Sequence, residues 1–166
     1  MLATLRKRPF SDMEWLFELK SDGFRCLVRE AGKRVALISR AGNLFNASFA
    51  DIVEAVAAVP RDFALDSELT VDEANGRSSF ERLQKRAVTK VPSRVRAAIV
   101  EHPARLYLFD ALSLDGADLR ELPLIERKDH LRDAFENTDT LIYTQGIVGA
   151  GSLCSSRRSA STLGGW

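Results

Sequence analysis

Hydrophobic and polar residues alternate in several short stretches of this chain and recur at helical spacing in others. Alternation predicts strands, and helical spacing predicts helices that bury one face. The predicted strands span residues 15–20, 24–30, 34–40, 61–71, 104–112 and 141–143. The predicted helices span 47–59, 78–87 with a capping box from Ser78 to Glu81, 89–102 beyond Pro92, and a segment from Leu122 to Phe135. This order, with glycine turns at 31–33, 39–43 and 114–116, predicts an α+β fold with an antiparallel sheet.

Two predicted strands carry acidic or aromatic residues that could belong to a functional site. In strand 61–71, alternation places Asp66 and Glu68 on one face, and two carboxylates in an apolar strand are costly unless paired, hydrogen-bonded or holding a metal. A polar cleft and a salt-bridged pair both satisfy this condition. In strand 104–112, alternation places Asp110 with Leu108, and Phe109 on the opposite face. Phe109 is then either a core residue or a platform for a nucleotide base.

The stretch Glu18–Arg25 ends an apolar run on Lys20 and continues with Ser-Asp-Gly-Phe-Arg. A desolvated lysine near cations loses proton affinity, and its neutral amine is a nucleophile. The planar fork of an arginine can hold a phosphate. The alternative is a hairpin, in which a Ser-Asp-Gly turn joins two strands and Lys20 and Arg25 are solvated flanks. Taken alone, this stretch favours the hairpin, since short motifs also occur by chance. Arg40 is likewise a turn residue or a second phosphate contact.

Length, composition and charge exclude several classes of protein. A chain of 166 residues with 45% hydrophobic and 28% charged residues is expected to form one globular domain with a core. A net charge of +1 means that any nucleic-acid contact must use a local patch. For the basic face of 89–102, a solvated surface is the favoured interpretation. The two cysteines form neither a disulfide framework nor a zinc motif, and the sequence has neither a membrane span nor a signal peptide, so we expect a cytoplasmic protein.

Four motifs, in order, resemble those of the covalent nucleotidyltransferases: ATP-dependent DNA ligases, RNA ligases and mRNA capping enzymes. They are Lys20–Arg25, Ser39–Asn43, Leu65–Glu68, and a block made of Tyr107–Leu112, Leu114–Gly116 and Leu122–Lys128. The stretch Trp15–Lys20, with Met1-Leu2-Ala3 upstream, is similar to the ligase domain of the bacterial DNA ligase D family. The resemblance covers about 1–151, and four motifs in order make chance implausible. It therefore favours Lys20 as a nucleophile.

The resemblance implies an antiparallel-sheet-rich, ATP-grasp-like adenylation domain and a three-step reaction. Lys20 attacks the α-phosphate of ATP, pyrophosphate leaves, and AMP moves from the lysine to a DNA 5′-phosphate before a 3′-hydroxyl seals the nick. Mg²⁺ is expected, because a triphosphate needs charge neutralisation. The implied roles are Lys20 as nucleophile, Arg25 and Arg40 on phosphate or ribose, Glu68 on ribose or metal, Phe109 on adenine, and Glu18 near the adenine edge.

The same resemblance implies partners and a location. Nicked or broken double-stranded DNA is the expected substrate, with end-joining proteins as further candidate partners, in the bacterial cytoplasm near the nucleoid. Two other functions stay open: a non-catalytic nucleotide-binding remnant and a relative that joins RNA ends.

The chain departs from the family pattern in two places. Ser67 stands where the family usually has glycine, which leaves open how closely a nucleotide can approach. The expected acidic metal motif, Lys-x-Lys motif and OB-fold domain do not follow, and Thr140–Trp166 contains neither Asp nor Glu. We therefore expect a partial adenylation domain over 1–148, an aberrant disordered tail over 149–166, no second acidic metal ligand beside Glu68, and weak or absent self-adenylation. A frameshift would explain the tail, because the codons of Leu163–Trp166 read one base later permit Leu-Glu-Gly.

Overall fold

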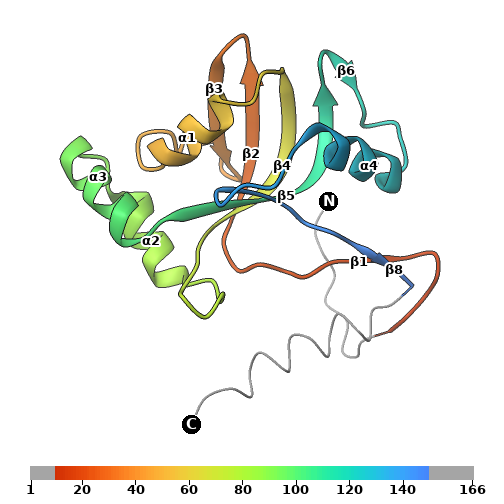
Figure 1. The fold of residues 1–166 in the computed structure, drawn as a ribbon, viewed down its shortest axis with the longest axis horizontal. Helices are drawn as coiled ribbons and strands as arrows, with labels where there is room; N and C mark the ends of the chain where they lie inside the picture. Colours follow the sequence, from red (N-terminus) through yellow and green to blue (C-terminus); the bar gives the residue numbers. More distant parts are fainter. Residues whose placement is uncertain (1–9, 150–166) are drawn as a thin grey trace. The chain divides into compact units, whose positions relative to one another are not determined.

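The computed structural model describes residues 10–149, which form two compact units. The described part of one unit comprises residues 10–20 and 144–149, and the other unit comprises residues 21–143. Each unit has a sheet of its own (Figure 1).

The larger unit is built on a six-stranded sheet with the order β3-β2-β4-β5-β6, in which β7 also pairs with β5. Its strands are β2 (Phe24–Ala31), β3 (Arg34–Ser39), β4 (Phe63–Val71), β5 (Ala104–Leu114), β6 (Ala117–Asp118) and β7 (Leu141–Tyr143). The β5–β7 pair is parallel and the other pairs are antiparallel. The prediction of an α+β fold rich in antiparallel sheet is confirmed.

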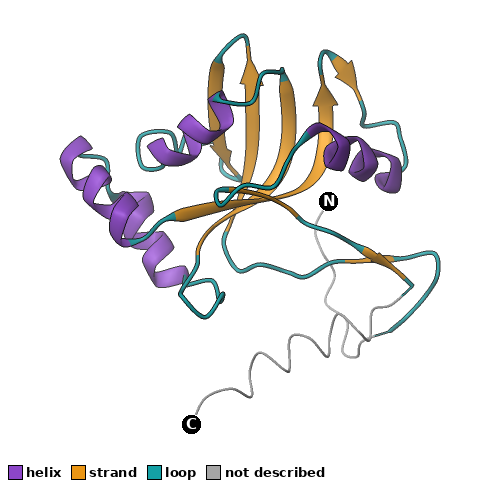
Figure 2. Ribbon diagram, in the orientation of Figure 1, coloured by secondary structure: helices purple, strands orange, loops and turns teal. Residues whose placement is uncertain are grey.

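Four helices accompany this sheet (Figure 2): α1 (Ala50–Ala57), α2 (Phe80–Val88), α3 (Pro92–Glu101) and α4 (Leu124–Ala134). Alternate residues of β2, β4 and β5 are buried, as expected for strands with one face on a core. Helix residues complete this core, and the buried ones among them are Ile52, Val56, Leu83 and Leu131. Burying one face of the sheet in this way leaves the other face for polar side chains.

The start of α2 differs from the prediction. The expected capping box from Ser78 to Glu81 is wrong, because the hydroxyl of Ser78 donates to the carboxylate of Asp72 at 3.0 Å. These two residues also form an isolated β-bridge that closes the loop between β4 and α2. The helix α3 begins at Pro92 as predicted, since proline suits the first helical position.

A buried arginine joins three helices of the larger unit. Arg86 of α2 is 1% exposed and binds both carboxylate oxygens of Asp51 in α1, at 3.0 and 2.7 Å. It also donates to the carbonyls of Ser48 and His102, the latter at the end of α3. Its guanidinium lies 4.7 Å from the ring of Phe49. Both Nη atoms are thus hydrogen-bonded and the charge is paired with a carboxylate, whereas the buried Nε has no hydrogen-bond partner.

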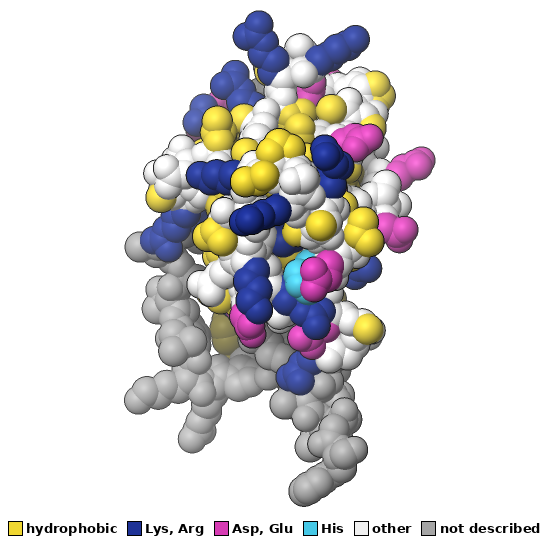
Figure 3. Space-filling view, turned by 90° about the vertical axis from the view of Figure 1, so that its left-hand side faces the viewer, with side chains coloured by type: hydrophobic (Ala, Val, Ile, Leu, Met, Phe, Trp, Pro, Cys, Tyr) yellow, Lys and Arg dark blue, Asp and Glu magenta, His cyan; other side chains and the backbone are white. Residues whose placement is uncertain are grey.

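The side of the molecule on which α2 and α3 lie carries many Lys and Arg side chains (Figure 3). Those of the predicted basic face, Lys90, Arg94 and Arg96, are all exposed. Their exposure agrees with a solvated surface.

The smaller unit contains β1 (Leu16–Phe17) and β8 (Ile147–Val148), which pair antiparallel. The hairpin interpretation of Glu18–Arg25 is wrong, because β1 pairs with β8 whereas β2 pairs with β3 and β4. The strand predicted over 15–20 is shorter in the structure, where only Leu16–Phe17 form β1. The ring of Phe10 contacts the rings of Trp15 and Phe17 edge-on, with centroids 5.3 and 5.2 Å apart.

The expected tail over 149–166 lies outside the described residues from residue 150 on. Within residues 10–149, none of the helices is both long and apolar enough to cross a membrane.

Candidate active site

A β-bulge shapes the centre of the sheet. The register of β4 and β5 pairs Asp66 with Asp110 and then Ser67 with Leu108, so that it skips Phe109. An extra residue on one strand bends it and re-aims the side chains around the bulge. Leu108 and Ala111 are buried in the core, whereas Phe109 and Asp110 are only half-buried. The expectation that Asp110 shares a face with Leu108 is therefore wrong, because strict alternation does not allow for a bulge.

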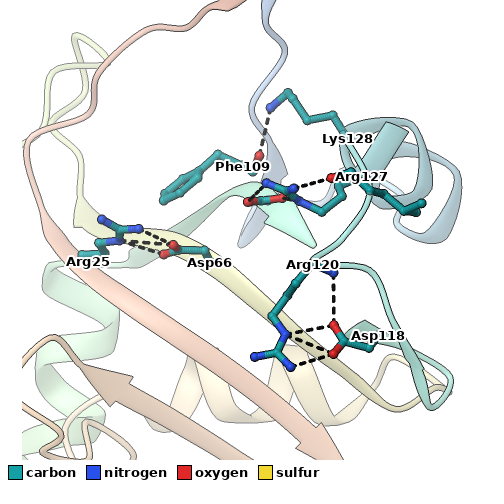
Figure 4. Close-up of polar contacts among 9 residues, drawn as sticks. Arg25, Asp66, Phe109, Asp118, Arg120, Arg127 and Lys128 are labelled. Carbon is teal, nitrogen blue, oxygen red and sulfur yellow. Dashed lines mark hydrogen bonds and ion pairs between the residues drawn. The ribbon is translucent and has the colours of Figure 1, made fainter. Parts of the chain in front are cut away.

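Arg25 and Asp66 form the central ion pair of the polar face (Figure 4). The Nε of Arg25 donates to both carboxylate oxygens, at 3.0 and 3.2 Å, and its Nη2 donates to Oδ2. The hydrogen bond with Asp66 raises the pKa of Arg25. The guanidinium also lies 5.9 Å from the centre of the Phe109 ring. Its side chain remains 47% exposed, so this fork is held in place but is open to an incoming anion.

Glu68 holds the backbone of the glycine in the first motif. The amide of Gly23 donates to Oε1 of Glu68 at 3.0 Å, and the register pairs Arg25 with Glu68. A Cβ on Gly23 would lie 2.2 Å from the carbonyl oxygen of Leu69, so only glycine allows this approach. Because φ of Gly23 is not left-handed, close packing explains this glycine and a turn does not.

Ser67 lies on the opposite face from its two acidic neighbours. It is fully buried, and its hydroxyl donates to the carbonyl of Cys26 at 2.6 Å across β2 and β4. The serine side chain therefore takes no space on the face of Asp66 and Glu68.

Arg127 and Lys128 of α4 contact the bulge, although the sequence had given neither of them a role in the site. Arg127 donates to both oxygens of Asp110 at 2.8 Å, which raises the pKa of Arg127. Lys128, only 2% exposed, donates through Nζ to the carbonyl of Phe109 at 3.0 Å and lies 5.2 Å from the ring of Tyr143. The sequence could have indicated the burial of Lys128, because it precedes the core residue Leu131 by about one helical turn and so lies on the buried face of the helix.

Arg40 follows β3, in an exposed turn that Gly42 closes with a φ of +82°. Ser39 pairs with Cys26, so Arg40 and Arg25 are each the next residue beyond this pair. Glu18 and Lys20 belong to the smaller unit. The structure thus brings Arg25, Glu68 and Phe109 onto one face of the larger unit, and adds Asp66 to them.

Between Phe10 and Gly149, the structure contains no group of three or more His, Cys, Asp or Glu residues that could hold a metal ion. Mg²⁺ usually keeps several waters and binds one or two carboxylates together with substrate phosphates. Both oxygens of Asp66 are bound by Arg25, so Glu68 is the carboxylate of this face that fits a metal arriving with a nucleotide.

Comparison with known proteins identifies the family. The family model described as "ATP dependent DNA ligase domain" matches residues 1–149. The Bacillus subtilis protein "Bifunctional non-homologous end joining protein LigD" is 30% identical over 139 residues, which are 80% of this chain and 23% of that protein. A "Probable DNA ligase" of Opitutus terrae is 36% identical over 126 residues, which are 76% of this chain and 12% of that protein.

Solved structures show the same fold. The ligase domain of Mycobacterium tuberculosis LigD matches with a TM-score of 0.72 and 24% identity, covering 92% of this chain and 46% of that one. A mycobacterial DNA ligase D complexed with ATP and MES matches equally well. This chain spans less than a quarter of the two curated relatives and about half of the solved domains. Since the family model matches nearly the whole chain, the chain belongs to the ATP dependent DNA ligase domain family.

Proposed function

We propose that residues 1–148 act as the adenylation part of an ATP-dependent DNA ligase, with Lys20 as the residue that accepts AMP. One observation carries this proposal: the hydrogen bond of 3.0 Å between the Gly23 amide and Glu68. It fixes the segment that follows Lys20 to the face that carries Arg25 and Phe109. Lys20 precedes Gly23 by three residues, and three extended residues span at most roughly 11 Å. Lys20 is therefore tied covalently to a segment that is itself hydrogen-bonded to Glu68.

The proposed reaction begins when the ammonium of Lys20 loses its proton. The neutral amine attacks the α-phosphorus of ATP, a P–N bond forms, and the bond from that phosphorus to the bridging oxygen breaks, so that pyrophosphate leaves. A DNA 5′-phosphate then takes AMP from the lysine, and a 3′-hydroxyl displaces AMP to seal the nick. Each transfer exchanges one phosphorus bond for another, and the chemistry needs neither an oxidant nor a reductant.

The polar face supplies groups suited to a nucleotide. Arg25 and Arg40 would hold phosphate or ribose oxygens, since guanidinium groups bind them with paired hydrogen bonds. Phe109 would stack on adenine, a contact worth about 1–3 kcal/mol. Glu68 would accept from the ribose, and Glu18 would lie near the adenine edge. Mg²⁺, held by the ATP phosphates with Glu68 as a candidate ligand, would neutralise charge on the triphosphate.

We further propose that this chain by itself forms the lysine adduct slowly. Residues 140–166 contain neither an acidic residue nor a lysine. They therefore provide no carboxylate side chain for a metal and no lysine ammonium for the α-phosphate in the transition state. Such electrostatic contributions are commonly the largest in catalysis.

Incubation of the full chain with Mg²⁺ and ATP labelled at the α- or γ-phosphate tests the proposal. We expect slow covalent incorporation of the α-label, loss of the γ-label with pyrophosphate, and no incorporation in Lys20→Ala. ATP binding without incorporation would favour the non-catalytic remnant, and absence of both binding and incorporation would refute the proposed function. Fast incorporation would confirm the role of Lys20 but contradict the expected slow chemistry. Where incorporation occurs, transfer of the label to nicked DNA or to RNA ends distinguishes the two joining activities.

A further inference from the structure

We propose that Arg127 and Lys128 are positioning residues, which hold the bulge of β5 so that the Phe109 ring is presented to the adenine base. The inference rests on the proposed function of Phe109 and names the residues that determine its orientation. Two consecutive residues of α4 contact two consecutive residues of β5: Arg127 binds the Asp110 carboxylate, and Lys128 binds the Phe109 carbonyl (Figure 4).

The bulge makes such support necessary. Phe109 is the residue that the β4–β5 register skips, so the strand ladder alone does not set its backbone. On the other side of β5, the pairing with β7 ends at Leu108 and Tyr143. The carbonyl of Phe109 therefore lies one residue beyond the end of one pairing and inside the irregularity of the other. The hydrogen bond from Lys128 fixes this carbonyl, and with it the direction of the Phe109 side chain.

The burial of Lys128 argues that its amine has a specific partner. A buried ammonium is costly, and a leucine or methionine would fill the same helix position without that cost. Lys128 is 2% exposed, and its Nζ reaches the Phe109 carbonyl at 3.0 Å and the Tyr143 ring at 5.2 Å.

Arg127 adds a second constraint one residue further along β5. Besides its bidentate pair with Asp110, it donates to the carbonyl of Leu122 at 2.7 Å, so that the loop before α4 is tied to the same point. Both side chains of the pair are mostly buried, 17% and 14% exposed. The planar fork of arginine gives this contact a direction that a lysine cannot reproduce.

A general tie between α4 and the sheet is the competing explanation, and the two differ in what they predict for ligands. If the contacts orient Phe109, their loss weakens binding of ATP, which has a base, and leaves binding of inorganic tripolyphosphate unchanged. If they only stabilise the unit, both ligands are affected alike. Affinities for both ligands, measured by calorimetry at a temperature where each variant is folded, separate these cases.

The variants are Lys128→Met, which keeps length and burial, and Arg127→Lys, which keeps charge but loses the fork. Arg86→Lys is the matched control, because Arg86 also binds an aspartate bidentately and also donates to backbone carbonyls, but between helices. Phe109→Leu keeps an apolar side chain that cannot stack on a base. If Lys128→Met fails to fold, Arg127→Lys carries the test.

We expect Lys128→Met, Arg127→Lys and Phe109→Leu each to lower ATP affinity by about tenfold, the scale of one lost base stack, with tripolyphosphate affinity unchanged. Arg86→Lys should leave both affinities unchanged. Equal weakening of both ligands by the α4 variants, or unchanged ATP affinity in them while Phe109→Leu loses it, would overturn the positioning role alone. Unchanged ATP affinity in Phe109→Leu would overturn the proposed role of Phe109 and the inference with it, whereas absence of ATP binding in the unmodified chain would refute the proposed function.

Discussion

Asp66 of β4 and Asp110 of β5 are register partners, so two carboxylates face each other across neighbouring strands. Like charges directly opposite in a sheet are destabilising. Each carboxylate here has its own arginine, Arg25 for Asp66 and Arg127 for Asp110, and each arginine binds both oxygens. Two matched ion pairs therefore lie on either side of Phe109.

Removing one of these arginines should leave its aspartate without an ion-pair partner and destabilise the protein. Arg127→Met leaves the Asp110 carboxylate mostly buried and opposite Asp66, and we expect it to lower the free energy of unfolding by about 3 kcal/mol. The double variant Arg127→Met/Asp110→Asn removes the unpaired charge of Asp110 and should be more stable than Arg127→Met alone. Urea denaturation measures both. A double variant no more stable than the single one would show that charge is not the cause.

Gly23 should tolerate no side chain. A Cβ would lie 2.2 Å from a backbone oxygen, so Gly23→Ala must move the strand end, at a cost of about 1–3 kcal/mol. It should also weaken ATP binding, because the hydrogen bond between the Gly23 amide and Glu68 is displaced. The control is Gly32→Asn, since Gly32 has open space around its Cβ position and asparagine accepts its φ of +56°. Equal stability of Gly23→Ala and the unmodified chain would contradict the packing argument.

Ser67 and Glu68 are neighbours in sequence with separate expected effects. Ser67→Gly removes a buried hydrogen bond to Cys26 and should lower the free energy of unfolding by about 1–2 kcal/mol, with ATP affinity unchanged. Glu68→Gln should weaken ATP binding more than it lowers stability. Thermal denaturation and calorimetry test the pair, and a change of ATP affinity in Ser67→Gly would show that the two faces are coupled.

We expect the buried thiol of Cys26 to lower the stability of the protein at high pH. Burial raises the pKa of Cys26 to about 12 from an ordinary value of 9.0. The folded state therefore holds this proton more tightly than the unfolded state, and its contribution to stability is complete below pH 9 and lost as pH rises towards 12. Cys26→Ala should show a smaller fall in stability over this range. An identical fall in the two proteins would indicate that other groups cause it.

Much of the larger unit could be predicted from local pattern. The strands β2, β4 and β5 follow alternation, β7 has the predicted bounds, and Pro92 begins α3 as expected. The pairing of β1 with β8 could not be predicted, because each strand has only two residues and the partners are separated by most of the chain. Local alternation cannot reveal a partner at that distance.

The grouping of the candidate residues could be predicted in part, and their geometry less so. Arg25, Glu68 and Phe109 were expected from the sequence to act together and do lie on one face, but the bulge at Phe109 depends on how β4 and β5 align. Strict alternation consequently misplaced Asp110. The packing that requires Gly23 is likewise tertiary, because the clashing oxygen belongs to Leu69.

The most direct test of the central claim is peptide mass spectrometry of the full chain after long incubation with ATP and Mg²⁺. The proposed function predicts a mass increase of one adenylyl group on the peptide that contains Lys20, absent from Lys20→Ala. An adduct confined to another residue, or no adduct in a protein that binds ATP, would contradict it.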